Sequence, residues 1–512
     1  MTVMFEAAEL GRKIDKKTYK AQLPELRAQL LQAQFALSKT NTPVILMISG
    51  VDAAGRGDVV NALNEWLDPR GLQTFAIESL TDEERERPYF WRYWRRLPQR
   101  GRIGIFFGGW YVDPIKQVVN EEINEANFEK QLSNVRRFEN MIVEDDALIL
   151  KFWLHLPKEE QRNRLKSHEK DKNAKRLVSK QDWKNHKLYD KYTQAAELAI
   201  RHTDTGGAPW TLVESTDSYY RDLTIGQTVL HALQKRLAEH DAKEAAKAAK
   251  KEAAANAPVI EVVEPKIIKP KTPQITVLDR VDLDQKLSSK EYRRALEKYQ
   301  GKLNRLAWAA HHKKRSLVAV FEGWDAAGKG GEIRRMTQAM DSRLYQVISV
   351  AAPTDEERAQ HYLWRFWRHI PRAGNVTMYD RSWYGRVLVE RIEKFAKEEE
   401  WKRAFLEIND FEEQLADDGA AIVKFWVHIS KEEQLRRFKE REKVAYKQHK
   451  LTEEDWRNRE RWDEYTAAIN DMVARTSTDY APWTLVAGND KRFGRIQALK
   501  TVCNSLEKVL DK

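Results

Sequence analysis

The sequence predicts an α/β fold that occurs twice along the chain, each time as a mainly parallel sheet flanked by helices. Two observations predict it. Apolar runs of strand length alternate with segments of helical periodicity, an alternation that is typical of parallel sheets with helical crossovers. The same landmarks also return after 273 residues, as at Gly50 and Gly323, where 323 − 50 = 273.

Further pairs of segments keep this spacing without a net insertion, so a whole domain is duplicated in tandem. The pairs are residues 81–85 with 354–358, 91–95 with 364–368, 151–153 with 424–426, 182–183 with 455–456, and 208–210 with 481–483. We place the first copy at residues 1–237 and the second at 276–512. The linker, residues 238–275, begins as an Ala-, Lys- and Glu-rich helix and continues as a Pro-punctuated, extended spacer.

A glycine-rich turn follows the first predicted strand of each copy. In the second copy this turn has the sequence FEGWDAAGKGG, and the strands are expected at residues 317–321, 346–351, 376–379, 421–427 and 483–486. Free backbone N–H groups and a helix N-terminus make such a turn a phosphate cradle. Its spacing is that of a P-loop, except that Gly330 stands where Ser or Thr normally binds Mg²⁺. The phosphate-binding residues expected here are Gly323, Ala326, Ala327, Gly328, Gly330 and Gly331.

A second motif, MYDRSWY, ends an apolar strand with an acid and follows the acid with an arginine. Because the loop offers no hydroxyl group, the carboxylates of Asp325 and Asp380 are the hard oxygen ligands predicted to hold Mg²⁺. Lys329 and Arg381 are predicted to bind phosphoryl oxygens, and the arginine can do so in bidentate fashion. These four residues form the predicted catalytic set.

Two further groups of cations are candidate phosphate ligands. The basic stretch 436–450 follows a strand at the place where nucleotide kinases carry a lid, and its predicted clamp consists of Arg437, Arg441, Lys443 and Lys447. A solvated basic helix is the alternative for this stretch. The other candidates for donor or acceptor phosphates are Arg365, Arg368, Arg386 and Arg391, for which structural salt bridges are an equally good explanation.

Composition restricts the class of protein and its partners. The chain has 512 residues, 42% of them hydrophobic, and a net charge of +11, which favours a globular protein with an anionic partner. Nucleic acid, a membrane surface and a phosphorylated substrate all satisfy that charge. A single cysteine, Cys503, excludes an intrachain disulfide. No apolar run approaches the ~20 residues that span a bilayer, and the N-terminus lacks an apolar signal region, so a cytoplasmic protein is expected.

The segments GWDAAGKGG, PTDEE with LWRFWRHIP, and YDRSWYGRVLVERI resemble the polyphosphate kinase 2 family, and the tandem copies resemble its two-domain class. The resemblance implies a P-loop kinase fold related to thymidylate kinase, with a lid rich in arginine and lysine. It also implies Mg²⁺-dependent transfer of a phosphoryl group from inorganic polyphosphate to a nucleotide, here AMP, giving ADP. Carried over by motif, the family's functional positions fall on Asp325, Lys329, Asp380, Arg381, Arg441 and Lys443.

The first copy departs from this pattern. Arg56 replaces the loop lysine, and Phe107 and Gly108 stand at the positions of the metal-binding acid and its arginine. In the lid, His168 replaces Arg441 and Ala174 replaces Lys447. We therefore predict that the first copy is catalytically inactive and that its glycine-rich turn keeps a structural role, with weak phosphate binding as the alternative.

Three other functions remain open from the sequence. They are a polyphosphate-dependent ADP or NDP kinase, an ATP-dependent nucleoside monophosphate kinase, and a polyanion-binding scaffold without catalysis. Gly330 argues against the ATP-dependent kinase, and the intact catalytic set argues against the scaffold. The expected partners are polyphosphate and AMP or ADP, with no nucleic acid and no membrane. Because a single-domain relative would pair with itself, we hypothesise that the copies form an internal pseudo-dimer, with further homo-oligomerisation left open.

Overall fold

The structure, a computed structural model, describes residues 3–77, 79–170, 178–256, 276–443 and 453–511. The chain splits into two compact units. Unit 1 comprises Met1–Ser79, Tyr93–Glu264 and Asp355–His361, and unit 2 comprises Leu80–Arg92, Pro265–Thr354 and Tyr362–Lys512. Each unit therefore contains most of one sequence copy together with a short segment from the other copy.

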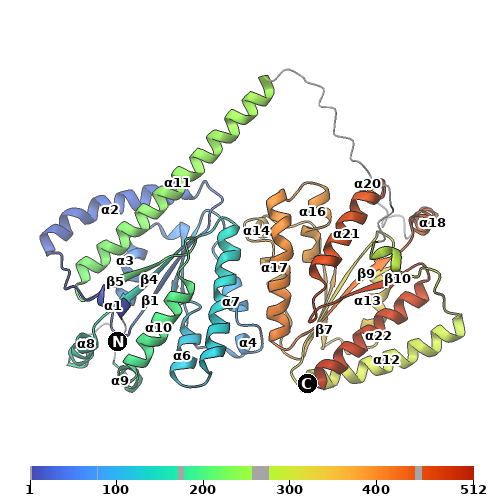
Figure 1. Cartoon of the computed structure of the whole chain (residues 1–512), viewed down its shortest axis with the longest axis horizontal. Helices are drawn as coiled ribbons and strands as arrows, with labels where there is room; N and C mark the ends of the chain where they lie inside the picture. The colour runs from blue at the N-terminus through green and yellow to red at the C-terminus, as the bar shows by residue number, and fades with distance from the viewer. Residues whose placement is uncertain (1–2, 78, 171–177, 257–275, 444–452, 512) are drawn as a thin grey trace. The chain divides into compact units, whose positions relative to one another are not determined.

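Unit 1 contains a five-stranded sheet in which every strand pair is parallel. Its spatial order is β2-β3-β1-β4-β5, with β1 (Val44–Gly50), β2 (Leu72–Ala76), β3 (Ile103–Phe107), β4 (Leu148–His155) and β5 (Trp210–Glu214). Both faces are covered by helices (Figure 1). The helices of this unit are α1 (Val3–Glu6), α2 (Lys16–Leu37), α3 (Arg56–Trp66), η1 (Pro69–Gly71), α6 (Val112–Val119), α7 (Glu125–Glu144), α8 (Lys158–Lys170), α9 (Lys180–Lys187), α10 (Tyr189–Thr203) and α11 (Ser218–Asn256).

Unit 2 repeats this arrangement. Its parallel sheet has the order β10-β9-β6-β8-β7, with β6 (Leu317–Gly323), β7 (Tyr345–Ser349), β8 (Val376–Asp380), β9 (Ala421–His428) and β10 (Trp483–Ala487). The helices are η2 (Leu278–Arg280), α12 (Ser289–His312), α13 (Lys329–Thr337), α15 (Trp364–Trp367), η3 (Trp383–Arg386), α16 (Val389–Ile392), α17 (Glu398–Asp417), α18 (Lys431–Glu442), α20 (Glu453–Glu460), α21 (Trp462–Thr476) and α22 (Lys491–Leu510). Helices α12, α13 and α22 cover one face, and α16, α17 and α21 cover the other (Figure 1).

The predicted α/β fold with parallel sheets is therefore confirmed. Its central strands β6 and β9 are apolar along nearly their whole length because helices bury both faces of the sheet. Local signals also set helix starts, as at α12, where Ser288 and Glu291 form a capping box. In the register of the sheet, Phe321 on β6 lies beside Asp380 on β8, so the two motifs end at one edge of the sheet.

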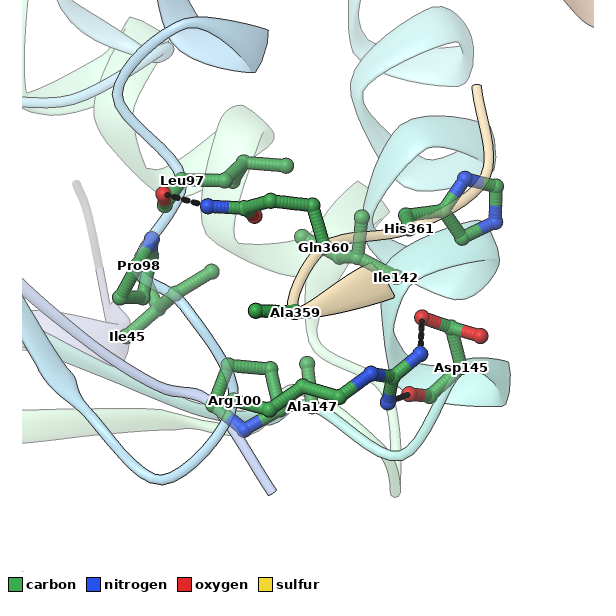
Figure 2. Close-up of a pocket in the computed structure, with 11 residues that line it drawn as sticks. Ile45, Leu97, Pro98, Arg100, Ile142, Asp145, Ala147, Ala359, Gln360 and His361 are labelled. Atoms are coloured by element: carbon green, nitrogen blue, oxygen red, sulfur yellow. Dashed lines mark hydrogen bonds and ion pairs between the residues drawn. The ribbon is translucent and has the colours of Figure 1, made fainter. Parts of the chain in front are cut away.

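The two short segments that belong to the other copy's unit have their own anchors. In unit 2, Glu86 accepts hydrogen bonds from Lys314 Nζ at 2.8 Å and from Arg372 Nε at 2.6 Å. In unit 1, Gln360 Nε2 donates to the Leu97 carbonyl at 3.2 Å and helps to line a small, mainly apolar pocket (Figure 2). The helices in or beside these segments are α4 (Asp82–Arg85), α5 (Trp91–Trp94) and α14 (Asp355–Arg358).

The predicted linker helix is present, since α11 continues beyond the sheet as far as Asn256 and is exposed along residues 241–252. The extended part of the predicted linker lies outside the described residues. Within the part of the chain that the structure describes, no helix is both long enough and apolar enough to cross a membrane.

Candidate active site

The glycine-rich turn of unit 2 has the geometry of a phosphate cradle. Gly323 has a φ of +153°, and a Cβ there would lie 2.6 Å from the Val427 carbonyl oxygen, so only glycine fits. Ala326 has a φ of +63°, a conformation that costs a residue with a Cβ about 1–3 kcal/mol. Helix α13 begins at Lys329 directly after the turn, which brings the positive end of its dipole to the site.

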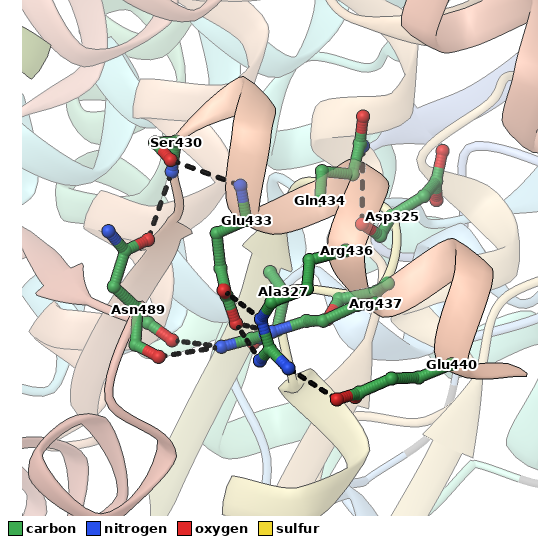
Figure 3. A network of polar contacts seen from close by, with 11 residues as sticks. Asp325, Ala327, Ser430, Glu433, Gln434, Arg436, Arg437, Glu440 and Asn489 are labelled. Carbon is green, nitrogen blue, oxygen red and sulfur yellow. Dashed lines mark hydrogen bonds and ion pairs between the residues drawn. The ribbon is translucent and has the colours of Figure 1, made fainter.

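Helix α18 holds the carbonyl groups of this turn from outside. Gln434 Nε2 donates to the Asp325 carbonyl at 3.2 Å, and Arg437 Nη1 donates to the carbonyls of Ala326 and Ala327 at 3.0 and 2.5 Å. Arg437 also donates from Nη2 to the carbonyls of Gly488 and Asn489 and from Nε to Glu433 (Figure 3). Ala327 N already donates to the Trp324 carbonyl at 3.0 Å, so the N–H groups placed for an anion are those at the start of α13.

Lys329 lies folded over the turn. Its Nζ donates to the carbonyl oxygens of Gly323 at 2.7 Å and Trp324 at 3.4 Å. These neutral partners are weaker than an anionic oxygen, because a charge-assisted hydrogen bond is roughly twice as strong. The lysine is thus placed to exchange backbone oxygens for phosphate oxygens.

Asp325 is held in a fixed orientation by long-range contacts. Asn458 Nδ2 on α20 donates to Asp325 Oδ2 at 3.0 Å, and Tyr465 Oη on α21 in turn donates to Asn458 Oδ1 at 3.0 Å. Arg381 Nη2 lies 3.5 Å from Asp325 Oδ1, which brings the two sequence motifs into contact. Asn458 was missed by the sequence analysis, which had no signal for it in the local pattern.

The two carboxylates offered for a metal come from neighbouring strand ends, Asp325 after β6 and Asp380 at the end of β8. No group of three or more His, Cys, Asp or Glu side chains is placed to hold a metal anywhere in the described ranges. This donor set fits Mg²⁺, which usually takes one or two carboxylates and completes its shell with water and substrate phosphate oxygens.

A cavity of about 590 Å³ joins the two motifs, and its polar lining includes Glu322, Asp325, Lys329, Arg381 and Asn458. The carboxyl group of Glu322 was not expected. It is buried, and its Oε1 accepts a hydrogen bond from Ser382 Oγ at 2.8 Å. Burial raises the pKa of Glu322, and the positive charge of Lys329 opposes that rise.

A buried hydrogen-bond network holds the Trp383 and Tyr384 side chains of the MYDRSWY motif. Lys424 Nζ donates to Glu412 Oε2 at 2.7 Å, to Tyr384 Oη at 2.9 Å and to the Thr476 carbonyl at 2.6 Å. Trp383 Nε1 donates to the same glutamate at 3.1 Å. Because every polar group of this network has a partner, the residues that follow Arg381 have little freedom to move.

The other predicted phosphate ligands lie in several environments. Arg386 pairs with Glu390 at 2.9 Å, and Arg391 pairs with Asp471 at 2.8 Å, as the salt-bridge explanation expected. The guanidinium groups of Arg365 and Arg368 lie over the rings of Phe366 and Trp364.

The predicted lid cations differ in their access to a ligand. Arg437 is 2% exposed and fully engaged under the loop, which departs from the clamp role predicted for it. Arg441 lies in the last turn of α18, and Lys443 caps the helix end. Lys447 lies outside the described residues.

The equivalent site of unit 1 keeps the turn without the catalytic set. Ala53 has a φ of +61°, and Arg164 Nη1 donates to its carbonyl at 3.2 Å, as Arg437 does in unit 2. Arg56 Nη2 pairs with Asp52 Oδ1 at 2.7 Å, and its guanidinium carbon lies 5.7 Å from the centre of the Phe107 ring. Among the described residues that line this cavity of about 1230 Å³, Asp52 is the only one with a carboxylate, and it is already paired.

Comparisons with known proteins identify the family of this chain. The family model for polyphosphate kinase 2 matches residues 13–241 and 286–512. A polyphosphate:AMP phosphotransferase of Pseudomonas aeruginosa is 48% identical over 510 residues, covering 99% of this chain and 100% of the relative. A protein of the same name from Pseudomonas syringae pv. tomato is 45% identical over 506 residues, covering 99% of this chain and 98% of the relative.

A crystal structure described as polyphosphate kinase 2 from Pseudomonas aeruginosa superposes with a TM-score of 0.86 at 46% sequence identity. The match covers 99% of this chain and 100% of that one. The resemblance seen in the motifs is thereby confirmed along both copies, and the chain belongs to the polyphosphate kinase 2 family.

Proposed function

We propose that this chain transfers a phosphoryl group from inorganic polyphosphate to AMP, giving ADP, and that unit 2 carries out the reaction. The observation that carries the proposal is the convergence of Asp325, Lys329 and Arg381 on one cavity at the edge of the sheet where Asp380 ends β8. The full-length relatives named polyphosphate:AMP phosphotransferase support AMP as the acceptor.

The proposed reaction needs positioning and charge neutralisation more than covalent help from the protein. An oxygen of the AMP phosphate attacks the terminal phosphorus of polyphosphate, and the bond from that phosphorus to the next bridging oxygen breaks. The products are ADP and a polyphosphate one phosphate shorter. Because the AMP phosphate is largely ionised at neutral pH, its oxygen needs no strong base.

The residues of unit 2 supply the required charges. The N–H groups of the turn and the start of α13 bind phosphate oxygens of the donor. Lys329 leaves the Gly323 carbonyl for a phosphate oxygen, and Arg381 binds two oxygens of the group in transfer. Mg²⁺, held by Asp325 and Asp380, would neutralise further negative charge on the phosphates.

Unit 1 is proposed to be inactive. Phe107 provides no metal ligand, and Gly108 provides no guanidinium. Asp52, the remaining acid, is paired with Arg56 and accepts a hydrogen bond from Asn185 at 2.8 Å. A metal would have to break the first of these contacts to reach Asp52, and no second acid stands at the position of Asp380. The predicted partners beyond substrate, the cytoplasmic location and the pseudo-dimer stay predictions.

One assay tests the proposed function. Purified protein is incubated with AMP and Mg²⁺ and with either polyphosphate or ATP as donor, and the nucleotides are separated by chromatography. We expect ADP with polyphosphate and none above background with ATP. If ADP forms with ATP as donor and not with polyphosphate, the protein is an ATP-dependent nucleoside monophosphate kinase instead. If no product forms with either donor, the polyanion-binding scaffold is the remaining alternative. Replacing AMP by ADP in the same assay identifies a polyphosphate-dependent ADP kinase.

A further inference from the structure

The buried carboxyl group of Glu322 has no part in the mechanism described above. Glu322 is 6% exposed and stands on β6 immediately before the turn. Buried carboxyl groups are rare unless they are paired or hydrogen-bonded, so its place in the cavity calls for an explanation. The hydrogen bond from Ser382 Oγ at 2.8 Å ties it to the residue that directly follows Arg381.

Arg381 has an unfavourable backbone conformation. Its φ is +65°, in the left-handed region that residues with a Cβ seldom adopt. Contacts from β6 hold it on both sides. Arg381 N donates to the Phe321 carbonyl at 3.1 Å, and the Ser382 hydroxyl donates to the neighbouring Glu322. The same hydroxyl accepts from Tyr384 N at 3.3 Å and so caps η3.

Unit 1 provides an internal control for these contacts. Gly108 takes the place of the arginine and has a φ of +106°, which costs glycine nothing. Its N–H still donates to the Ile48 carbonyl at 3.0 Å, so the backbone contact is the same in both units. The side-chain contact is not the same, because Ser49 replaces Glu322 and donates from Oγ to the Gly108 carbonyl at 2.7 Å.

The glutamate is thus present in the copy that has the arginine and absent from the copy that has glycine. Unit 1 also has Gly109, with a φ of +86°, at the position of Ser382, so the partner of the carboxyl group is replaced together with the arginine. The glutamate therefore goes with the Arg381–Ser382 pair, in which the residue that needs the left-handed conformation carries a Cβ.

We propose that Glu322 is a positioning residue, which holds Arg381 in the left-handed conformation through Ser382 and so directs the guanidinium group at the phosphoryl group in transfer. The carboxyl group lines the same cavity as Lys329 and Arg381. The proposal rests on the proposed function for its consequence, a lower turnover, but not for its geometry.

The test is a double-mutant cycle in the full chain, with Glu322→Ala, Arg381→Gly and the double variant. If Glu322 acts through Arg381, Glu322→Ala lowers kcat about tenfold or more in the parent, as expected for a misplaced reacting group. In the Arg381→Gly background the same change lowers kcat less than about twofold, because there is no guanidinium group left to position. Equal losses in both backgrounds, or no loss in the parent, would overturn the proposal.

Further variants separate positioning from stability. Glu322→Gln keeps an oxygen that accepts from Ser382 and should restore most of the activity that Glu322→Ala loses. Ser382→Ala should resemble Glu322→Ala. The matched control Ser49→Ala removes the side-chain contact at the position of Glu322 in unit 1 and should leave kcat within about twofold, since the proposal assigns no chemistry to that unit.

A binding measurement keeps the inference distinct from the proposed function. Calorimetric titration with inorganic tripolyphosphate gives a Kd that does not depend on catalysis. Glu322→Ala should weaken binding about tenfold in the parent and less than about twofold in the Arg381→Gly background. If the parent makes no ADP but shows this pattern, the proposed function fails and the positioning role stands. If the parent makes ADP and the pattern is absent in both measurements, the positioning role alone fails.

Discussion

The phosphate loops of the two units have nearly the same backbone and different side chains. Ala53 and Ala326 have φ values of +61° and +63°, and both loops are held from outside by an arginine of the following helix, Arg164 or Arg437. Around this shared frame, unit 2 has an acid, a lysine and an arginine where unit 1 has Phe107, Arg56 and Gly108. The residues that both units share therefore build the loop, and the residues that differ are those to which we assign the chemistry.

The largest expected effect comes from removing the acid that unit 1 lacks. Asp380→Asn should lower turnover about 10²–10³-fold. The variant would hold Mg²⁺ less tightly, and the positive charge of Mg²⁺ offsets the negative charge of the phosphoryl group in transfer. Steady-state rates of ADP formation measure it, and part of the loss should return at higher Mg²⁺. Phe107→Leu at the matched position should change turnover by less than about twofold. A comparable loss in Phe107→Leu would mean that unit 1 takes part in the reaction.

The next effect concerns a residue that both units share. Arg437→Lys removes the forked contact with the loop carbonyls and should lower turnover about ten- to a hundredfold through misplacement of the loop. Arg164→Lys should leave turnover nearly unchanged. Hydrogen exchange should show a more open loop in unit 2 for Arg437→Lys and in unit 1 for Arg164→Lys. If Arg437→Lys opens the loop without slowing turnover, loop position does not limit the reaction.

The buried networks should respond alike in the two units. Lys424 and Lys151 each lie 2.7 Å from a buried glutamate, Glu412 or Glu139. Glu→Gln at either position leaves a buried lysine without its charge partner, which costs about 3–5 kcal/mol. Hydrogen exchange of β9 and β4, resolved by mass spectrometry, gives the opening free energy of each unit. Unequal losses of opening free energy would show that the two networks differ in strength although their Lys–Glu distances are the same.

The last expected effect concerns the pH dependence of stability, and it comes from a buried carboxyl group that has no counterpart in unit 1. Burial raises the pKa of Glu332 on α13 to about 8, whereas unit 1 has Val59 at this position. Because the folded-state pKa is above the unfolded value, this group's stabilising contribution is complete below pH ~4.5 and is lost as pH rises towards 8, by at most about 1.4 kcal/mol per pH unit. Glu332→Gln should therefore stabilise unit 2 at pH 8 more than at pH 5.5, as measured by hydrogen exchange of α13. The same gain at both pH values would exclude this ionisation.

The strand, loop and acid positions were predictable because each follows from a local pattern that the repeat shows twice. The contacts that orient the site were not. Asn458 and Arg437 reach the loop from 133 and 111 residues away, and no periodicity links them to it. Arg437 was mistaken for a clamp because it lies in a run of cations. Its identity with Arg164, in a copy without the catalytic set, was the available sign that it supports the loop.

Glu322, unlike Arg437, differs between the two copies. The sequence alone already contains its replacement by Ser49, together with the replacement of Arg381 by glycine. Only the structure shows that Ser382 joins the glutamate to the arginine. A difference between the copies thus marks the residue that we propose positions Arg381, and an identity marks Arg437, which holds the loop in both units.

The most direct test of catalysis in unit 2 alone is one substitution made at the same position of both loops. Asp325→Asn and Asp52→Asn change the same atom of the same turn, and Asn458 and Asn185 donate to the two carboxylates in the same way. Initial rates of polyphosphate-dependent ADP formation should fall at least about a hundredfold for Asp325→Asn and by less than about twofold for Asp52→Asn. Substantial activity in folded Asp325→Asn, or a matching loss in Asp52→Asn, would contradict the account.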